Sequence, residues 1–200
     1  MVALFITAKV GGNAMTWHLR LGYVVLALLL FRVVWGVVGG RWSRFASFFY
    51  GPGRVLRYLR GQGEAQEHVG HNPLGALSVF ALLGALLAQV LTGLMTDDEI
   101  AFSGPLTRFV SGDTVAWATS LHTDVGQWLL VALVALHLAA IAFYTHIKRH
   151  SLVRPMVLGD KQLPAATPAS RDDARTRLLA AVVLAAAAGV AWWVAQLGVF

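Results

Sequence analysis

The chain contains no cysteine. This excludes a cysteine-ligated iron–sulfur cluster, a thiolate-ligated haem and a haem attached covalently through a C-x-x-C-H motif. Charge is also scarce: only 13% of the residues are Asp, Glu, Lys or Arg, whereas 57% are hydrophobic. Soluble domains carry about 25% charged residues, so this composition excludes an ordinary soluble core and indicates a polytopic membrane protein.

Long apolar runs predict an all-α bundle of four transmembrane helices. The predicted spans are Trp17–Val38, Pro73–Met95, Ser120–Tyr144 and Leu178–Leu197. The formal charge of +6 could suggest a nucleic-acid partner, but the basic residues lie between the apolar runs, where a membrane explains them better. By the positive-inside rule, segments 41–70 and 146–177 are cytoplasmic and the acidic loop 96–119 is external, which predicts a multi-pass protein of the bacterial inner membrane with both chain ends outside.

Two histidines are the main chemical signal in the third span. His122 stands where the apolar run begins, and His137 follows fifteen positions later within it. In a regular α-helix this spacing is a rotation of about 1500°, roughly 60° past four full turns, with a rise of about 22 Å. An ionisable residue at this depth is by default a functional one. Neutral imidazoles in an apolar bundle suit haem iron.

A second pattern, H-x-x-x-G, occurs twice at the external start of a span. His18 is followed by Gly22, and His122 is followed by Gly126. A glycine one turn from a ligand, on the same face, leaves space for a flat macrocycle against the backbone. Two such helices facing each other predict one haem with two histidine ligands near the external face. The alternative is a pair of interfacial histidines beside ordinary packing glycines.

Two further residues fit the same interpretation. His137 is a candidate ligand of a second haem toward the cytoplasmic side, although no other histidine lies at that depth in the four spans. The alternative is a histidine hydrogen-bonded to a neighbouring helix. Arg32 lies fourteen positions after His18, on nearly the same face. Its guanidinium could pair with a haem propionate or extend to the membrane interface.

Several short motifs, taken in order, resemble the bacterial cytochrome b561 family, which includes the cytochrome b subunit of nickel–iron hydrogenases. They are Trp17–Tyr23, Gly70–Ala76, Thr92–Leu94, Leu121-His122, Ala135–His137 and Leu152–Met156. The resemblance covers roughly residues 8–161. It implies an antiparallel bundle with two b-type haems that passes electrons between the quinone pool and a periplasmic redox partner, such as a c-type cytochrome or a hydrogenase or dehydrogenase subunit. By position, His18 and His122 match the ligands of the periplasmic haem, and His137 matches one ligand of the cytoplasmic haem.

The chain departs from the family pattern at its start. Family members have an earlier spanning helix whose histidine is the other ligand of the cytoplasmic haem, and Met1 falls about where that helix should end. We interpret residues 1–16 as the tail of a longer element or as a short external segment, and Phe5–Ala8 could be the last turn of that helix. The helix would then lie upstream or come from a partner, or the chain would hold only the external haem. The spacing between His122 and His137 is also about one residue longer than the family pattern.

The expected organisation is a haem-binding transmembrane domain at 1–161, a cytoplasmic linker at 162–177 and an additional transmembrane helix at 178–200. Iron with two imidazole ligands has no open position, which favours electron transfer over oxygen chemistry. Two other functions remain open: a self-sufficient quinol oxidoreductase, and a haem-free transport or assembly subunit with the histidines in a proton path. The sequence does not decide whether the protein is an enzyme in its own right.

Overall fold

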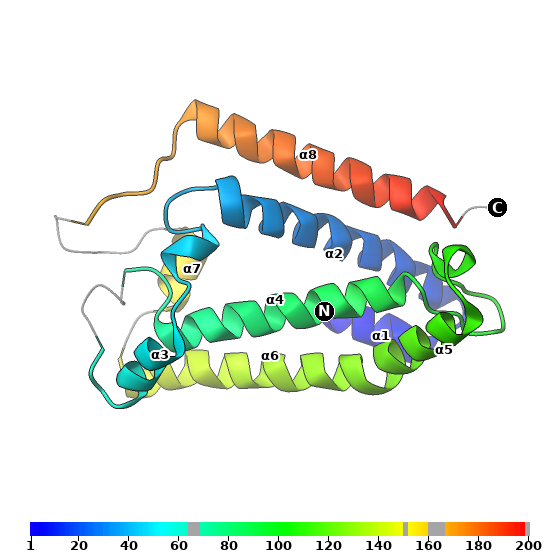
Figure 1. Ribbon diagram of the computed structural model, residues 1–200, viewed down its shortest axis with the longest axis horizontal. Helices are drawn as coiled ribbons and strands as arrows, with labels where there is room; N and C mark the ends of the chain where they lie inside the picture. Colours follow the sequence, from blue (N-terminus) through cyan, green and yellow to red (C-terminus); the bar gives the residue numbers. More distant parts are fainter. Residues whose placement is uncertain (64–68, 150–151, 160–166, 199–200) are drawn as a thin grey trace.

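Four long helices run along the length of the molecule in the computed structural model (Figure 1). The structure describes residues 1–63, 69–149, 152–159 and 167–198. The helices long and apolar enough to cross a membrane are α2 (Asn13–Val38), α4 (Pro73–Gly93), the continuous helix Gly112–Ile147 and α8 (Ala174–Gln196). The described residues form no β-strand, only one isolated bridge between Asp97 and Ser103. The all-α, four-span prediction is confirmed.

The third span is longer than predicted and is not a uniform α-helix. It consists in order of α5 (Gly112–Ser120), the π-helix η4 (Leu121–Gly126), α6 (Gln127–Ala142) and a second π-helix, η5 (Phe143–Ile147). The predicted external loop, which ended at Thr119, is therefore wrong in its last part. The hydroxyl of Ser111 accepts a hydrogen bond from the backbone N–H of Thr114, so this N-cap starts the helix at Gly112.

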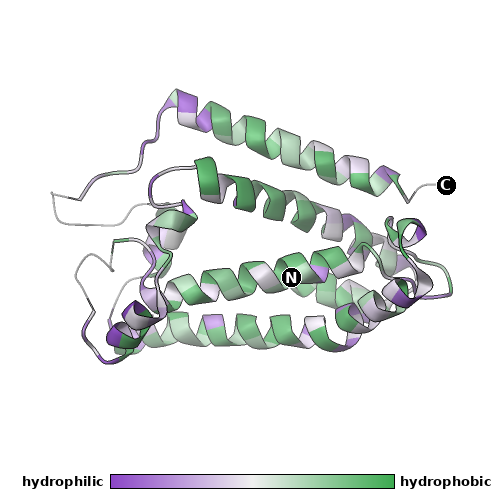
Figure 2. Ribbon diagram, viewed as in Figure 1, coloured by the Kyte–Doolittle hydropathy of each residue, from purple (hydrophilic) through white to green (hydrophobic). Residues whose placement is uncertain are grey.

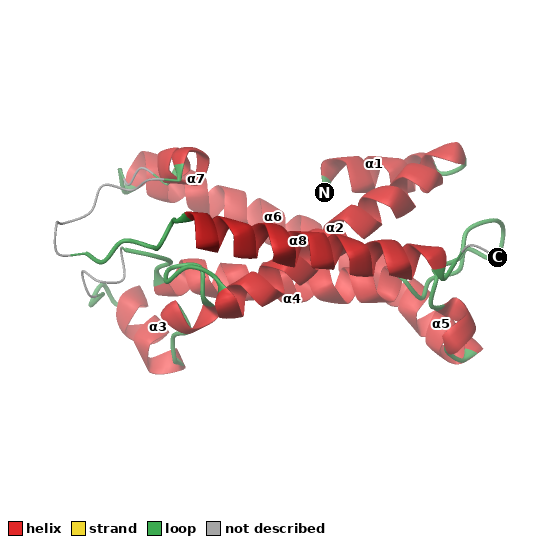
Figure 3. Cartoon of the chain, turned by 90° about the horizontal axis from the view of Figure 1, so that it is seen from above, coloured by secondary structure: helices red, strands yellow, loops and turns green. Residues whose placement is uncertain are grey.

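The first residues also differ from the prediction. Val2–Val10 forms helix α1, which begins midway along the bundle and runs to the end where α2 starts (Figures 1 and 3). The ring of Phe5 meets the ring of Trp128 edge to face at 5.9 Å, so α1 lies against α6 as well as α2. The helix is longer than the single turn predicted at Phe5–Ala8. The external position of residues 1–16 stays a prediction.

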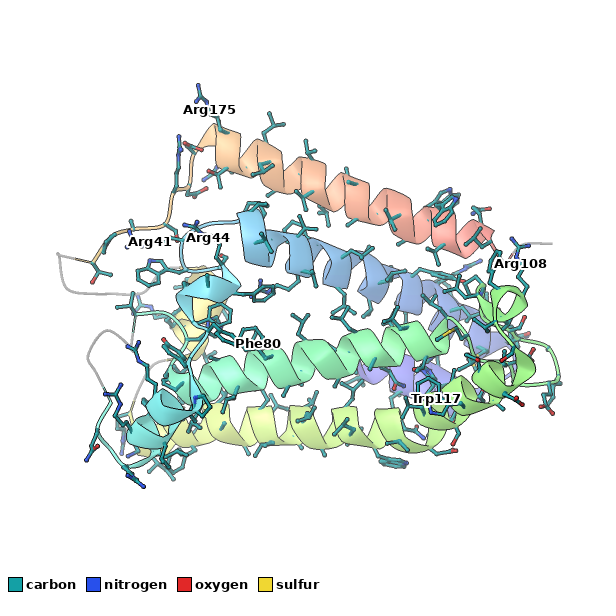
Figure 4. The ribbon with its side chains drawn as sticks, in the orientation of Figure 1. Arg41, Arg44, Phe80, Arg108, Trp117 and Arg175 are labelled. Atoms are coloured by element: carbon teal, nitrogen blue, oxygen red, sulfur yellow. The ribbon has the colours of Figure 1, made fainter. Side chains whose placement is uncertain are left out.

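The remaining described helices are short and lie at the two ends of the bundle. They are the 3-10 helices η1 (Phe45–Ser47) and η3 (Thr107–Phe109), and the α-helices α3 (Pro52–Leu59) and α7 (Val153–Leu158). We call the two ends of the bundle the α3 end and the α5 end. Arg41, Arg44 and Arg175 lie at the α3 end, and Arg108 lies at the α5 end (Figure 4). Of the predicted linker, residues 162–166 lie outside the described part of the chain.

The spans consist mostly of hydrophobic residues, and hydrophilic residues gather at the two ends (Figure 2). Leu136 and Trp192 remain 66% and 70% exposed although they lie within spans, which is the pattern of a surface that faces lipid. The small core joins Leu26 of α2, Leu94 after α4 and Ala191 of α8. Helix α8 begins at Ala174, where Asp173 accepts a hydrogen bond from the backbone N–H of Thr176. It packs on the outer side of α2 (Figure 1).

Candidate haem site

Two histidines that are far apart in the sequence face each other at the α5 end. His18 lies in the second turn of α2, and His122 lies in η4. Their ring centroids are 6.1 Å apart and their planes are perpendicular, at 90°. Both side chains are partly buried. The structure therefore brings together the two histidines of the repeated H-x-x-x-G pattern.

Each of these imidazoles is fixed by a backbone carbonyl of a different helix. His18 Nδ1 lies 2.9 Å from the carbonyl oxygen of Leu4 in α1. His122 Nδ1 lies 2.9 Å from the carbonyl oxygen of Gln89 in α4. Because a carbonyl oxygen only accepts, both Nδ1 atoms carry the proton and donate it. Each neutral ring then has its lone pair on Nε2, the tautomer that a metal-ligating histidine needs.

Helix α4 provides the surface on which His122 rests. A β-carbon placed on Gly93 would lie 2.7 Å from Cε1 of His122, so only glycine leaves room for this ring. The residue directly before Gly93 is the buried Thr92, whose hydroxyl donates to the carbonyl oxygens of Ala88 and Gln89. Back-bonding of this kind often bends a helix. The Gln89 carbonyl that Thr92 contacts is the same one that accepts the proton of His122.

The two glycines of the repeated pattern have different surroundings. A β-carbon placed on Gly22 would meet no atom within 4 Å, so the backbone at this position is open to a flat group. A β-carbon placed on Gly126 would overlap the amide oxygen of Gln89. Gly126 therefore makes room for a side chain of α4. This role was missed from the sequence.

His137 lies further along the third span, in α6, and its Nδ1 is 3.0 Å from the hydroxyl oxygen of Ser78 in α4. The sequence analysis considered such a hydrogen bond as the alternative to haem ligation. A bond at Nδ1 is compatible with both interpretations, because Nε2 is the atom that would ligate iron. Ser78 was missed. The sequence did contain one indication of its role. Ser78 lies eleven residues before Gln89, close to three helical turns, which places both polar residues on one face of α4.

The π-helix η4 changes the predicted geometry of the third span. It begins directly before His122 and has i→i+5 hydrogen bonding, so one turn includes an extra residue. The rotation of roughly 60° predicted between His122 and His137 assumed a uniform α-helix and is corrected.

Arg32 lies near the other end of α2. Its guanidinium donates to the carbonyl oxygen of Ser43 at 3.3 Å and lies 4.6 Å from the centre of the Phe45 ring. Gly36 allows this arrangement, because a β-carbon there would overlap the Phe45 ring. The contacts of Arg32 in the structure are thus with the loop that follows α2 at the α3 end. A pairing with a haem propionate stays a prediction.

The paired histidines fit a haem iron in distance and in chemistry. Two metal–nitrogen bonds of about 2 Å, with the ring radius added on each side, separate the imidazole centres by about 6 Å. The observed separation is 6.1 Å. Within the described residues, no group of three or more His, Cys, Asp or Glu side chains is arranged to hold a bare metal ion. The pair is therefore better suited to a metal that brings its own equatorial ligands, as haem does.

Comparisons with known proteins agree with this chemistry. Residues 1–159 match the family described as prokaryotic cytochrome b561. The chain is 28% identical over 162 residues to a probable Ni/Fe-hydrogenase B-type cytochrome subunit of Bradyrhizobium diazoefficiens, a match that covers 72% of this chain and 65% of that protein. A subunit of the same description from Azotobacter chroococcum is 29% identical over 160 residues, covering 71% and 65%. The chain thus spans about 65% of the length of these relatives. No solved structure matches it.

Proposed function

This chain belongs to the prokaryotic cytochrome b561 family, and on that premise we propose that it is a membrane-bound b-type cytochrome in which His18 and His122 are the two axial ligands of one haem near the external face. The protein transfers electrons between the quinone pool and a periplasmic redox partner. Four membrane spans and membership of a membrane cytochrome family place the chain in a prokaryotic membrane.

The observation that carries the proposal is the geometry of the two imidazoles. Their centres are 6.1 Å apart, and both Nδ1 protons are donated to backbone carbonyls. Such hydrogen bonds fix the ring orientation and increase the basicity of the ligating nitrogen. Haem, when bound, supplies a one-electron redox centre, and imidazole on both sides leaves it no open position for oxygen. The residues of this chain hold the rings in position, and the apolar spans exclude water.

A second haem on the cytoplasmic side is part of the proposal, with His137 as one ligand. Ser78 fixes Nδ1 of His137 in the way that Gln89 fixes Nδ1 of His122. Both hydrogen-bond partners lie on α4, so this helix supports one histidine toward each end of the third span. The other axial ligand of this second haem is not identified among the described residues.

The periplasmic partner is proposed from the relatives, which are described as cytochrome subunits of nickel–iron hydrogenases. A hydrogenase is therefore the first candidate, and a c-type cytochrome or another dehydrogenase subunit is the alternative. The α5 end has an open depression of about 680 Å³, with Asp97, Glu99, Arg108 and Asp124 among its lining residues. These polar groups lie at the end of the bundle that holds His18 and His122, where electrons would be exchanged with such a partner.

The test is a reduced-minus-oxidised visible spectrum with a pyridine haemochrome assay on the purified protein, expressed as haem per chain. We expect b-type bands that are lost in His18→Ala and His122→Ala. His137→Ala should keep the external haem, so it serves as the matched histidine control. A colourless protein after expression with ample haem would overturn the proposal and favour the haem-free transport or assembly function. Reduction of the purified protein by quinol with transfer to an acceptor, without a partner subunit, would favour the self-sufficient oxidoreductase.

A further inference from the structure

Gln89 contacts His122 through two separate groups. Its backbone carbonyl accepts the Nδ1 proton of the ring at 2.9 Å, and its side-chain Nε2 donates to the backbone carbonyl of His122, also at 2.9 Å. We propose that Gln89 is the positioning residue of the external haem site: it fixes both the backbone and the ring of His122 and so sets the plane of this ligand relative to His18. The inference rests on the proposed function, because it concerns how a haem ligand is oriented.

The π-helix η4 explains why a side chain from another helix is needed here. Its i→i+5 pattern departs from regular α-helical pairing, and π segments of this kind occur frequently at functional sites. Several carbonyls around η4 accept bonds from side chains. Those of Thr119 and Thr123 accept from the Thr123 hydroxyl and the Gln127 amide, both within the same helix. The carbonyl of His122 accepts from α4, so Gln89 joins the ligand segment to its neighbouring helix.

The orientation of the Gln89 amide follows from its two neighbours. Its nitrogen must face the carbonyl of His122, because that oxygen only accepts. Its oxygen then points toward Gly126, where a β-carbon would overlap it. This oxygen is buried and has no hydrogen-bond partner among the described residues. A buried acceptor without a partner destabilises the folded protein, so the orientation in which the Gln89 amide contacts His122 lowers the free energy of unfolding.

Two hydrogen bonds from Gln89 constrain His122 more than a single hydrogen bond would. The bond to the backbone fixes where the side chain of His122 begins, and the bond to Nδ1 fixes the rotation of the ring. Gly93 removes the β-carbon that would otherwise push the ring aside. The result is the perpendicular arrangement of the imidazoles of His18 and His122, at 90°. If the amide of Gln89 is lost, we expect the ring to rotate even where iron remains bound.

The test compares Gln89→Met with Gln127→Met in purified, haem-loaded protein. Methionine keeps approximate size and removes the amide. Gln127 is a matched control, because its amide also donates to a carbonyl of η4, that of Thr123, without contacting His122. The readouts are haem affinity, the reduction potential and the largest g value of the ferric low-spin signal, which reports the angle between axial imidazole planes. For Gln89→Met we expect about tenfold weaker haem affinity, typical of losing a partner that supports a metal ligand, together with a shifted g value.

A second variant, Gly126→Ala, leaves Gln89 in place and displaces its amide, so it should also shift the g value. The added methyl comes within 2.9 Å of the backbone carbonyl oxygen of Leu121 as well. This variant also tests the role of the Gln89 amide if the Gln89→Met protein does not fold. Unchanged g values and affinity in Gln89→Met, or in a folded Gly126→Ala, would overturn the inference while leaving the haem proposal intact. An equal shift in Gln127→Met would also overturn it. Wild-type protein without haem would instead overturn the proposed function itself.

Discussion

The hydroxyl oxygen of Ser78 lies 3.0 Å from Nδ1 of His137, and this hydrogen bond joins α4 to α6 toward the α3 end. It corresponds to the contact between the Gln89 carbonyl and His122 toward the α5 end. Both histidines of the third span are therefore oriented by hydrogen-bond partners on a single neighbouring helix. A helix that orients two candidate ligands without providing either one is difficult to recognise from histidine motifs alone.

Ser78→Ala tests the role of His137. Removing the hydroxyl takes away the hydrogen-bond partner of Nδ1, so we expect haem at the His137 site to bind about 10- to 100-fold more weakly. The haem held by His18 and His122 should be unaffected. Redox titration that resolves the two haems is the measurement, and Ser47→Ala is the control, because its hydroxyl donates to the nearby carbonyl of Arg44. Loss of the external haem in Ser78→Ala would contradict the independence of the two sites.

Gly93→Ala tests the packing of His122 on α4. The added methyl would lie 2.7 Å from the ring, so either the imidazole or the backbone of α4 must move. Overpacking of this kind costs roughly 1–3 kcal/mol, and we expect a lower haem content and a changed ferric spectrum. Gly84→Ala is the matched control on the same helix, since a β-carbon there meets no atom within 4 Å. It should keep the haem and, as Ala replaces Gly in a helix, stabilise the protein by about 0.5–1 kcal/mol. Identical spectra for the two variants would argue against the packing role.

Single cysteines test the predicted orientation in the membrane. Because the chain has no cysteine of its own, each variant carries one thiol. Asp113 near the start of α5 and Arg60 after α3 are both exposed and lie at opposite ends of the bundle. In intact spheroplasts, an impermeant maleimide should label Asp113→Cys and spare Arg60→Cys, and disruption of the membrane should expose both. The reverse pattern would place the arginine-rich end outside and contradict the positive-inside assignment.

Asp173 gives a prediction about pH. It accepts hydrogen bonds from the backbone N–H and hydroxyl of Thr176 and pairs with Arg171 at 2.7 Å, and these contacts lower the pKa of its carboxyl to about 2. Its pKa is lower in the folded protein than in the unfolded chain, where it is about 3.9. Its contribution to stability is therefore complete above the unfolded pKa and is lost as the pH falls through about 2.

The start of α8 should accordingly fray in strong acid. Hydrogen exchange at the amides of Thr176 and Arg177 is the measurement, with the wild type compared to Asp173→Ala, which removes the capping oxygen. We expect the variant to show faster exchange already at neutral pH and little further change with acid. Equal protection of these amides in both proteins at neutral pH would show that the cap does not hold the helix end.

Much of the molecule was predictable because its solvent is a membrane. Apolar runs of spanning length can only be helices there, since every backbone polar group must be paired within the segment. The composition and the four runs therefore determined the fold class, and the charge of the loops gave the predicted orientation. The repeated H-x-x-x-G pattern identified His18 and His122 correctly as a pair that meets in space. These signals are local, and each can be read within one segment.

The predictions that failed depended on contacts between segments or on fine backbone geometry. Nothing in the local pattern indicates that η4 is a π-helix, because its stability depends on neighbours such as Gln89 as well as on its own residues. Ser78 and Gly93 contribute only through residues opposite them on the third span. The α1 helix acquires its place by packing on α2 and α6.

The sequence by itself thus determined a four-span membrane bundle with a facing pair of histidines, because hydrophobic length and ligand spacing are properties of single segments. The tertiary structure alone decided how those ligands are held. It set the tautomer of each imidazole through carbonyls of Leu4 and Gln89. It also assigned the space at Gly126 to the Gln89 side chain, and it placed Ser78 beside His137. The physical reason is that a hydrogen bond between helices depends on their relative position and rotation, which are set only when the whole bundle packs.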